Sequence, residues 1–246
     1  MLILVTNDDG VEAKGIQALA KGLKSLKNCR VVVVAPDREQ STRSHSLTLH
    51  RPLRILKKGK DLYAIDGTPT DCVAIGCARI LESPPDLIVS GINRGANVGD
   101  DVHYSGTVSA AMEGGLKGIP AIAISQLSRG KFQYQMAVKF AIKMVKAVRR
   151  NSLPPHVVLN VNVPENCKSL DFELTKTGKR DYGEACIERF DLRGRPYYWV
   201  GGDKYEFRDI RKSDCNAVVK GKISVTPLRV DMTDESFLKK MRAWKW

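Results

Sequence analysis

The 246-residue sequence predicts an α/β fold with a mostly parallel sheet, and three observations lead to this prediction. Short apolar runs such as Leu2–Val5 and Arg30–Ala35 are typical of buried strands. A segment with helical spacing lies between these two runs, and a strand, helix, strand unit is right-handed and parallel. Polar loops follow the strands, and open parallel sheets bind ligands at that end of their strands. The fold class therefore also predicts where a site would lie.

Composition places the chain among globular proteins, with 43% hydrophobic and 27% charged residues. Met1 leads directly into the first strand, and we find neither a basic leader with a cleavage site nor an apolar run long enough to span a bilayer. A cytoplasmic protein without a membrane segment is therefore expected. The cysteines show no zinc-ligand spacing, and most are expected to be core residues or free thiols, with a disulfide left open. They are Cys29, Cys72, Cys77, Cys167, Cys186 and Cys215.

The formal net charge of +13 raises the question of a polyanionic partner. No acidic residue occurs between Gly114 and Pro164, and four basic residues share one face of an expected helix there. They are Lys139, Lys143, Lys146 and Arg150. A solvated helix face is the favoured interpretation, and an anion-attracting surface is the alternative. Aromatic residues that would stack on bases are scarce here, so nucleic-acid binding is not the leading hypothesis.

The first loop, Asn7-Asp8-Asp9-Gly10, follows the strand Leu2–Val5 directly. Two adjacent carboxylates repel each other, and a divalent cation with oxygen ligands is the natural partner that keeps both ionised. The alternative is a solvated turn, because Asp and Gly are common turn residues. A helix with apolar residues from Ile16 to Leu26 follows. The loop lacks a Gly-x-Gly-x-x-Gly pattern, which argues against a dinucleotide cofactor.

The second loop, Pro36–Ser46, is rich in hydroxyl groups and is expected to face the same crevice as Asp8 and Asp9. Serines here are ordinarily solubilising loop residues, and His45 is more often a hydrogen-bonded loop histidine than a ligand. The stretch from residue 47 to 65 is expected to form a short β excursion. The turn Gly67–Asp71 then feeds a helix, with Thr70 expected as its N-cap and residues 73–81 as its continuation.

A third strand, Asp86–Ser90, ends in the loop Gly91–Gly99, which contains Asn93 and Asn97. Its glycines let the backbone pass close to a ligand, and its amide oxygens suit a hard cation. Further along, Ser105-Gly106-Thr107 lies at the expected N-terminus of a helix over residues 108–116. Such a terminus favours a phosphate, although a simple hydroxyl N-cap explains the same residues. A phosphate site beside a carboxylate-bound cation would form a phosphohydrolase centre.

The rest of the chain is expected to complete a core over residues 1–165 and to add an arm over 166–246. The core gains a strand Pro120–Ser125, a helix Phe132–Arg150 and a strand His156–Val163. The arm is expected to contain a hairpin near residues 191–202, a strand Lys222–Thr226 and a closing amphipathic helix. An arm of this kind often serves oligomerisation, which is our hypothesis for it.

Taken together, the motifs resemble the SurE family of stationary-phase survival proteins over nearly the whole chain. The motifs that carry the resemblance are Asn7-Asp8-Asp9-Gly10, Ala35-Pro36-Asp37-Arg38 with Ser41, His45-Ser46-Leu47-Thr48, Gly67-Thr68-Pro69-Thr70-Asp71, Ser90-Gly91-Ile92-Asn93 with Asn97, Tyr104-Ser105-Gly106-Thr107, Arg193-Gly194-Arg195-Pro196 and Ser224-Val225-Thr226-Pro227-Leu228. In the arm, Asp214-Cys215-Asn216-Ala217 matches the family pattern only loosely.

The resemblance implies a metal-dependent 5′(3′)-nucleotidase or acid phosphatase with a Rossmann-like three-layer core. Its C-terminal β/α arm would be exchanged between subunits, giving homodimers or tetramers. One divalent cation per subunit, Mg²⁺ or Mn²⁺, would be held by Asp8, Asp9, Ser41 and Asn93. The phosphate would be surrounded by Asn97, Ser105, Gly106 and Thr107. The role of Ser41 rests on the resemblance alone, and the turn Thr68–Asp71 would help to shape the pocket.

The reaction expected from this site is hydrolysis of a nucleoside monophosphate to nucleoside and phosphate, with 3′-monophosphates and polyphosphate left open as further substrates. The cation would lower the pKa of an attacking water, and Asp8 or Asp9 would accept its proton. The sequence leaves open which of the two does so, and an aspartyl-phosphate route is the rival mechanism. The competing functions are a nucleotide-binding regulatory module without turnover and a nucleic-acid-binding protein.

Overall fold

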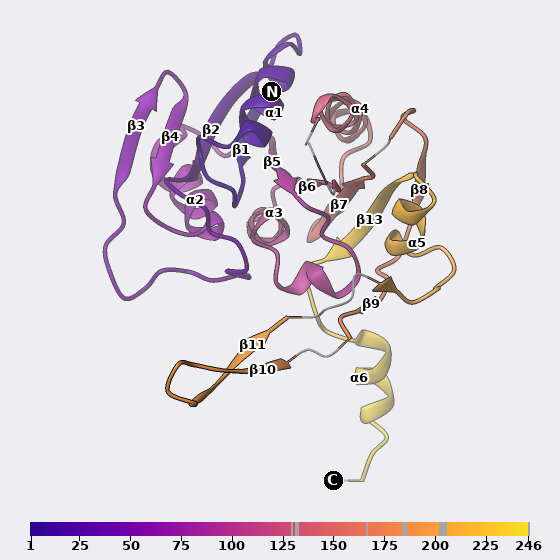
Figure 1. Cartoon of the computed structure of the whole chain (residues 1–246). Coiled ribbons are helices and arrows are strands. Elements are labelled where there is room, and N and C mark those ends of the chain that lie inside the picture. Colours follow the sequence, from indigo (N-terminus) through magenta and orange to yellow (C-terminus); the bar gives the residue numbers. More distant parts are fainter. Residues whose placement is uncertain (129, 131–132, 166, 184–185, 202–205, 246) are drawn as a thin grey trace.

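The computed structural model describes residues 1–128, 130, 133–165, 167–183, 186–201 and 206–245 (Figure 1). Its core is a nine-stranded sheet in the order β3-β4-β2-β1-β5-β6-β7-β13-β8. The strands are β1 (Leu2–Thr6), β2 (Arg30–Pro36), β3 (Ile55–Gly59), β4 (Leu62–Ile65), β5 (Leu87–Arg94), β6 (Ala121–Gln126), β7 (Val157–Val163), β8 (Phe172–Leu174) and β13 (Ile223–Arg229). The predicted α/β class with a mostly parallel sheet is confirmed.

Six neighbouring strands of this sheet, from β4 to β7, run parallel. The chain starts on β1 in the middle of the sheet, builds outward through β2 and β4, and then returns to the other side of β1 with β5. The strand order therefore reverses between β1 and β5, and such a switch point is where open α/β sheets form their ligand crevice. Residues that follow β1 and β5 are thus placed beside each other.

Two pairs of helices cover the sheet and make the three layers, with α1 (Lys14–Lys24) and α4 (Gln135–Asn151) on one face. On the opposite face lie α3 (Gly106–Leu116) and α2 (Pro69–Ile75), which continues as a π-helical turn, η1 (Gly76–Ile80). Each helix buries its apolar stripe against the branched residues of the sheet, as Ile16, Leu19 and Leu23 do in α1. Phe132, the predicted first residue of the helix α4, lies outside the described residues.

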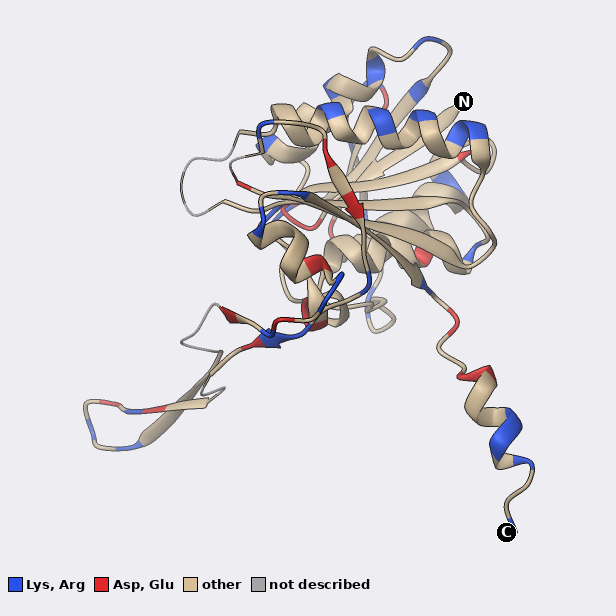
Figure 2. Cartoon of the chain, turned by 90° about the vertical axis from the view of Figure 1, so that its right-hand side faces the viewer, with Lys and Arg blue, Asp and Glu red and all other residues tan. Residues whose placement is uncertain are grey.

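The predicted basic face of α4 is exposed, with lysine and arginine residues spaced along the helix (Figure 2). The opposite side of α4 buries Phe140, Ala141 and Met144 on the sheet. One of the lysines, Lys143, lies 4.7 Å from the centre of the Phe172 ring and so covers apolar surface with its stem. The preference for a solvated face over a polyanion site stays a prediction.

The start of α2 corrects one expectation from the sequence. Thr68, not Thr70, is the N-cap: its side chain accepts a hydrogen bond from Asp71 N–H, and the Asp71 carboxylate accepts one from Thr68 N–H. Pro69 takes the first helical position, where its missing N–H costs nothing, and this assigns the cap to the residue before it. Thr70 is instead a buried residue inside the first turn.

Part of the segment predicted as an arm extends the core sheet. β13 pairs antiparallel with β7, from Ser224 opposite Asn162 to Arg229 opposite Val157, and β8 pairs with its far side. A short helix, α5 (Asp214–Val219), packs beside them. The stretch 47–65 also joins this sheet, since β3 and β4 form its opposite edge. The division at residue 165 remains a prediction.

Two other C-terminal elements project away from the core (Figures 1 and 2). One is a hairpin of β10 (Cys186–Phe190) and β11 (Pro196–Val200), and the other is the helix α6 (Glu235–Met241). The hairpin departs from a small two-stranded sheet of β9 (Arg180–Asp181) and β12 (Glu206–Phe207). All six cysteines are free thiols. Within the described part of the chain, no helix combines the length and apolar character needed to cross a bilayer.

Candidate active site

Asp8 lies at the carboxyl end of β1, where the sheet meets the first turn of α3. Its side chain is almost fully buried, and the Thr107 hydroxyl donates a hydrogen bond to its Oδ1. The backbone N–H of Thr107 also interacts with this carboxylate. Burial, and to a lesser degree the neighbouring Asp9, raise the pKa of Asp8 to about 6 against the lowering effect of the Thr107 hydrogen bond. The Asp8 carboxylate is thus held by hydrogen bonds from Thr107 in a buried position that disfavours its ionised form.

Gly106 allows α3 to approach Asp8 this closely. A Cβ atom at position 106 would lie 2.8 Å from the Asp8 Cβ and 3.1 Å from both Asp8 Oδ2 and Pro69 Cγ. Ser105 caps the helix, with its Oγ accepting a hydrogen bond from Val108 N–H at 3.1 Å. The predicted helix start at Ser105-Gly106-Thr107 is confirmed, and the structure sets it directly against the first carboxylate of the Asp-Asp pair.

Asp9 faces the other way, into an open cleft of about 790 Å³. Its Oδ2 accepts a hydrogen bond from Arg94 N–H at 3.0 Å, which ties the end of β1 to the end of β5. Burial and the nearby Glu39 charge raise the pKa of Asp9, while Arg94 opposes them. The cleft is lined by Asp9, Glu12, Ala13, Lys14, Glu39, Ser41, Arg94, Gly130 and Tyr134.

The loop after β2 is fastened to the loop after β1. Gln40 N–H donates to the Asp8 carbonyl at 2.7 Å, and Val11 N–H donates to the Pro36 carbonyl at 2.8 Å. Gly10 has a φ of +97°, and a Cβ there would lie 3.1 Å from the Arg38 backbone. Ser41 follows Gln40 directly, lines the same cleft as Asp9, and donates its hydroxyl to Glu39 Oε1 at 2.8 Å.

Asn93 is the second-to-last residue of β5 and precedes Arg94, whose backbone N–H donates to Asp9. Its Nδ2 donates to the Gly95 carbonyl at 2.9 Å, so the amide oxygen is the atom left for a ligand. Of the residues that the resemblance assigned to a cation, Asp9 and Ser41 line the same cleft. The Asp8 carbonyl accepts a hydrogen bond from Gln40 N–H, next to Ser41, and Asn93 precedes Arg94, whose N–H donates to Asp9. That these four residues bind one cation stays a prediction.

The donor set of this cluster fits a hard divalent cation. It consists of two carboxylates, a hydroxyl and an amide oxygen, all of which are oxygen ligands of the kind that Mg²⁺ and Mn²⁺ accept. Burial is the main cause that raises the pKa of both carboxyls, and a neighbouring carboxylate adds to it in each case, Asp9 for Asp8 and Glu39 for Asp9. In addition, the buried Asn7 Oδ1 has no hydrogen-bond partner among the described residues.

Asn97, the remaining residue of the predicted phosphate set, is held from the opposite side of the crevice. Its carbonyl accepts from Asn160 Nδ2 at 2.8 Å and from Asn162 Nδ2 at 3.0 Å, and its own N–H donates to Asn162 Oδ1. Its side-chain amide donates to Ser125 Oγ at 2.8 Å. The two asparagines of β7 thus act as a buried support for the loop after β5, a role that their alternation with valines in the sequence did not indicate.

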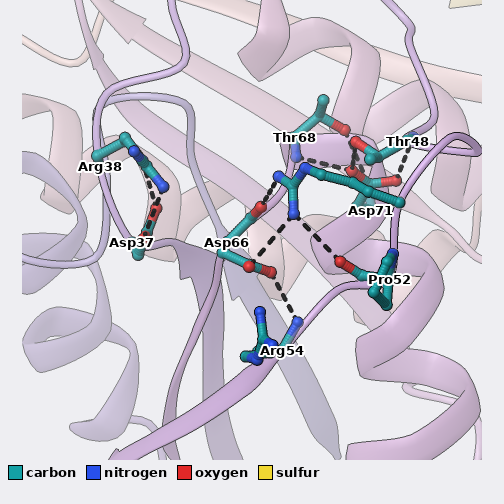
Figure 3. A network of polar contacts seen from close by, with 9 residues as sticks. Asp37, Arg38, Thr48, Pro52, Arg54, Asp66, Thr68 and Asp71 are labelled. Atoms are coloured by element: carbon teal, nitrogen blue, oxygen red, sulfur yellow. Dashed lines mark hydrogen bonds and ion pairs between the residues drawn. The ribbon is translucent and has the colours of Figure 1, made fainter.

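Asp71 connects the turn Thr68–Asp71 to Thr48, just after the second loop (Figure 3). Besides closing the capping box, its carboxylate accepts from Thr48 N–H at 3.0 Å and from Thr48 Oγ1 at 2.7 Å. Arg51 contacts Asp66, at 3.2 Å between Nη1 and Oδ2. The turn reaches the site through Pro69, which packs beside Gly106.

His45 is a hydrogen-bonded loop histidine, as the sequence favoured. Its Nε2 lies 3.2 Å from Glu113 Oε2 on α3, and Lys117 pairs with the same carboxylate at 3.2 Å. The contact fastens the second loop to α3.

Several residues of the cleft were not identified from the sequence, notably Glu39, Arg94 and Tyr134. Glu39 and Arg94 are close in sequence to the candidate ligands Ser41 and Asn93, which was the one signal available. Tyr134 is the residue just before α4 and is distant in sequence from these candidate ligands. The packing of α4 against α1 brings it to the cleft.

Comparison with known proteins gives one consistent result. Residues 3–184 match the family model described as survival protein SurE. The chain is 49% identical over 248 residues to the 5′-nucleotidase SurE of Geotalea daltonii, covering 100% of this chain and 99% of that protein. It is 46% identical over 245 residues to the 5′-nucleotidase SurE of Myxococcus xanthus, covering 99% and 93%. The crystal structure of the SurE protein from Aquifex aeolicus superposes with a TM-score of 0.89 at 42% identity, covering 98% of each chain.

Proposed function

The chain belongs to the SurE family, and we infer from this premise that it is a 5′-nucleotidase, a hydrolase of nucleotide phosphomonoesters. The observation that carries the site assignment is the contact between the two halves of the predicted centre. Thr107, in the first turn of α3, holds the Asp8 carboxylate, and Gly106 lets the helix end reach it. A carboxylate pair and an anion-binding helix terminus side by side form the arrangement that phosphate-ester hydrolysis requires.

We further propose that Asp8, Asp9, Ser41 and Asn93 hold one divalent cation, with Mg²⁺ or Mn²⁺ best suited to their oxygen atoms. When bound, such a cation supplies charge stabilisation for the phosphoryl group and a lower pKa for an attacking water. The buried Asn7 Oδ1, next to Asp8 in sequence and without a hydrogen-bond partner among the described residues, supports this assignment.

The two carboxylates have different surroundings, and we assign them different roles. Asp8 is buried and engaged by Thr107, so it serves to hold the site together. Asp9 lines the open cleft, so it is the carboxylate placed to accept a proton from water. The first turn of α3 stabilises the phosphoryl oxygens through its backbone amides and the helix dipole. The nucleoside occupies the cleft between Asp9 and Tyr134.

The projecting elements support association of the chain with itself, as a dimer or tetramer through its C-terminal part. Trp199 and Val200 on the hairpin are 64% and 88% exposed, and Phe237 and Trp244 near α6 are 45% and 51% exposed. Large apolar side chains gathered on elements that leave the core are typical of protein interfaces.

One assay tests the proposed function. Phosphate release from a panel of nucleoside 5′- and 3′-monophosphates is measured with EDTA, and again with added Mg²⁺ or Mn²⁺. Release that requires the metal is expected. Tight nucleotide binding without release would instead indicate a regulatory module, and binding to nucleic acid that weakens steeply with salt would indicate a polyanion-binding protein.

A further inference from the structure

The segment between Asn97 and Ser105 leads into the phosphate-binding end of α3, and two of its anchors come from the C-terminal third of the chain. We propose that Asp214, Arg180 and Tyr182 are positioning residues that fix this segment and thereby set the affinity of the site for phosphate. This inference rests on the proposed function. None of the three belongs to the predicted cation or phosphate set, and all three follow the core limit predicted at residue 165.

The first anchor is the Asp214 carboxylate at the start of α5, which is fully buried. Its Oδ2 accepts a hydrogen bond from Gly99 N–H at 3.0 Å. Its Oδ1 accepts from Gly178 N–H at 2.7 Å and from Cys215 N–H at 2.8 Å. Three backbone amides from three segments converge on one carboxylate, so Asp214 joins the loop after β5 to the strand region that precedes the hairpin.

The fit around this anchor is tight. Gly99 has a φ of +56°, and a Cβ at position 99 would lie 3.1 Å from the Gly178 backbone and 3.3 Å from Cys215 Sγ. Val98 packs with Cys215 and Val218 in a small separate apolar cluster. The segment therefore has little freedom to move without disturbing α5.

The second anchor acts on η2 (Gly99–His103), the 3₁₀ turn that directly precedes Ser105. Arg180 Nη1 lies 3.1 Å and 3.0 Å from the two carboxylate oxygens of Asp101, and the Tyr182 hydroxyl donates to the same carboxylate. The Arg180 guanidinium also lies 4.7 Å from the centre of the Tyr182 ring. With side-chain exposures of 20% and 14%, Arg180 and Asp101 form a partly buried pair.

Asp101 passes this constraint to the helix end through its main chain. Its carbonyl accepts hydrogen bonds from Tyr104 N–H and from Ser105 N–H, both at 3.1 Å. Ser105 is the N-cap of α3, and Gly106 and Thr107 follow it. The side chain of Asp101 is thus gripped by the C-terminal region, while its backbone holds the cap of the phosphate-binding turn.

The consequence is a dependence of phosphate binding on residues that do not touch phosphate. A displacement of about 1 Å in a positioned group can cost on the order of 100-fold in rate, and a well-placed anion site is equally sensitive. The helix end contacts phosphate both in the bound substrate and during the reaction. Weakening this contact therefore raises KM more than it lowers kcat.

The test compares four substitutions with a matched control in the full-length chain. Arg180→Met and Tyr182→Phe weaken the grip on Asp101, Asp214→Asn weakens the grip on Gly99, and Arg180→Lys keeps a single charged nitrogen able to contact Asp101. The control is Lys222→Met, which breaks the exposed 2.8 Å pair with Glu173 and touches no residue between 97 and 105. Steady-state kinetics on a nucleoside 5′-monophosphate and inhibition by inorganic phosphate are measured for each.

We expect Arg180→Met and Asp214→Asn to raise KM and the inhibition constant of phosphate together by about 10-fold, with kcat changed by less than about 3-fold. Arg180→Lys should recover most of the affinity, and Lys222→Met should match the parent chain. Unchanged KM in both Arg180→Met and Tyr182→Phe would overturn the inference, as would an equal loss in Lys222→Met.

A binding measurement separates this inference from the proposed function. Calorimetric titration with inorganic phosphate should show weaker binding in Arg180→Met, whereas titration with Mn²⁺ should be the same as for the parent chain. Thermal unfolding is followed in parallel to recognise a variant that no longer folds. In that case Tyr182→Phe decides, because it removes only one hydroxyl group from a partly buried side chain. If the parent chain itself releases no phosphate, the proposed function fails; if it does and the variants bind phosphate normally, only the present inference fails.

Discussion

The carboxyl edge of the sheet buries polar side chains, whereas the projecting C-terminal elements expose large apolar ones. At the edge, functional side chains are held by hydrogen bonds from other residues: the Thr107 hydroxyl donates to Asp8, and the Arg94 backbone N–H donates to Asp9. On the hairpin β10–β11 every residue of both strands other than Ile187 is exposed, including the large apolar side chains of Phe190, Trp199 and Val200.

This difference teaches what each region depends on. The edge is organised by the fold of a single chain, because parallel strands bring their carboxyl ends together and the helices bury the rest. The hairpin has no core of its own, and an isolated two-stranded hairpin is marginally stable in water. It therefore gains its order from whatever covers it, and a second copy of the chain is the partner proposed here.

The largest effect is expected from Asp9→Asn, which removes a ligand charge from the edge without changing its shape. Metal-dependent phosphate release should fall by on the order of 100-fold or more, since even groups that merely support metal ligands contribute about 10- to 100-fold. Phosphate release and Mn²⁺ affinity are measured together. Asp61→Asn is the control, because Asp61 pairs with Arg30 at the opposite end of the strands. Normal metal-dependent turnover in Asp9→Asn would show that the site lies elsewhere.

A second strong effect is expected from Gly106→Ala, which sharpens the comparison by adding one methyl group where α3 meets Asp8 at the edge. The new Cβ would lie 2.8 Å from the Asp8 Cβ, so either α3 or Asp8 must shift. We expect a loss of about 1–3 kcal/mol in the free energy of unfolding together with a large loss of activity. The matched control is Gly59→Ala, whose Cβ would meet its nearest neighbour only at 3.9 Å. Full activity in Gly106→Ala would contradict the close approach.

The hairpin gives the third test, and here the effect should fall on assembly and leave the core intact. Trp199→Ser should weaken self-association by about 2 kcal/mol or more if this residue is an interface anchor, and the sedimenting mass should decrease at low concentration. Thermal unfolding of the core should change little. Leu49→Ser serves as control, because Leu49 is 86% exposed on a loop of the core. An unaltered mass would show that the hairpin is not the interface.

Truncation at residue 165, the predicted limit of the core, would not test the hairpin alone. A chain cut there would lose β13 and β8, which pair within the core sheet, as well as the hairpin. Substitution on the hairpin itself avoids that loss.

The smallest effect concerns Glu113, which fastens the second loop to α3. Burial raises the pKa of Glu113, but the hydrogen bonds from His45 and Lys117 outweigh it and hold this pKa below the ordinary value of 4.5. The folded state therefore favours the ionised form, so the stabilisation is complete above pH 4.5 and is lost as the pH falls through the folded-state pKa. Glu113→Gln should lower the free energy of unfolding at pH 7 by less than about 1 kcal/mol. Denaturant titrations should show the difference shrinking in acid; a constant difference would exclude the mechanism.

The sequence was sufficient for the features that depend on local pattern. Leu2–Val5 followed by Asn7-Asp8-Asp9-Gly10 predicts a strand and its terminal loop, and β1 with Asp8 and Asp9 occupies that place. The helix start at Ser105 is equally local. The cap at Thr68 can also be predicted from the sequence, because proline strongly favours the first helical position and Pro69 directly follows Thr68. The prediction of Thr70 as the cap is wrong because it does not take this preference into account.

Features that depend on pairing across the chain could not be predicted in this way. The strand Lys222–Thr226 was expected, but nothing within it indicates that it pairs antiparallel with β7 and so belongs to the core sheet. The sequence around Asp214 does not indicate that its carboxylate accepts from the distant backbone amides of Gly99 and Gly178 as well as from that of the adjacent Cys215. Contacts of this kind arise only when segments that are far apart in sequence pack together.

The two outer strands of the core sheet have a consequence for how the molecule can associate. β3 carries Lys57 and Lys58 on a fully exposed edge, and β8 at the other edge has only three residues. Charged lysines and very short strands are the devices by which natural sheets resist stacking edge to edge into aggregates. With both ends of the sheet protected in this way, uncontrolled fibre-like growth is disfavoured, and self-recognition is left to the surfaces that carry aromatic residues.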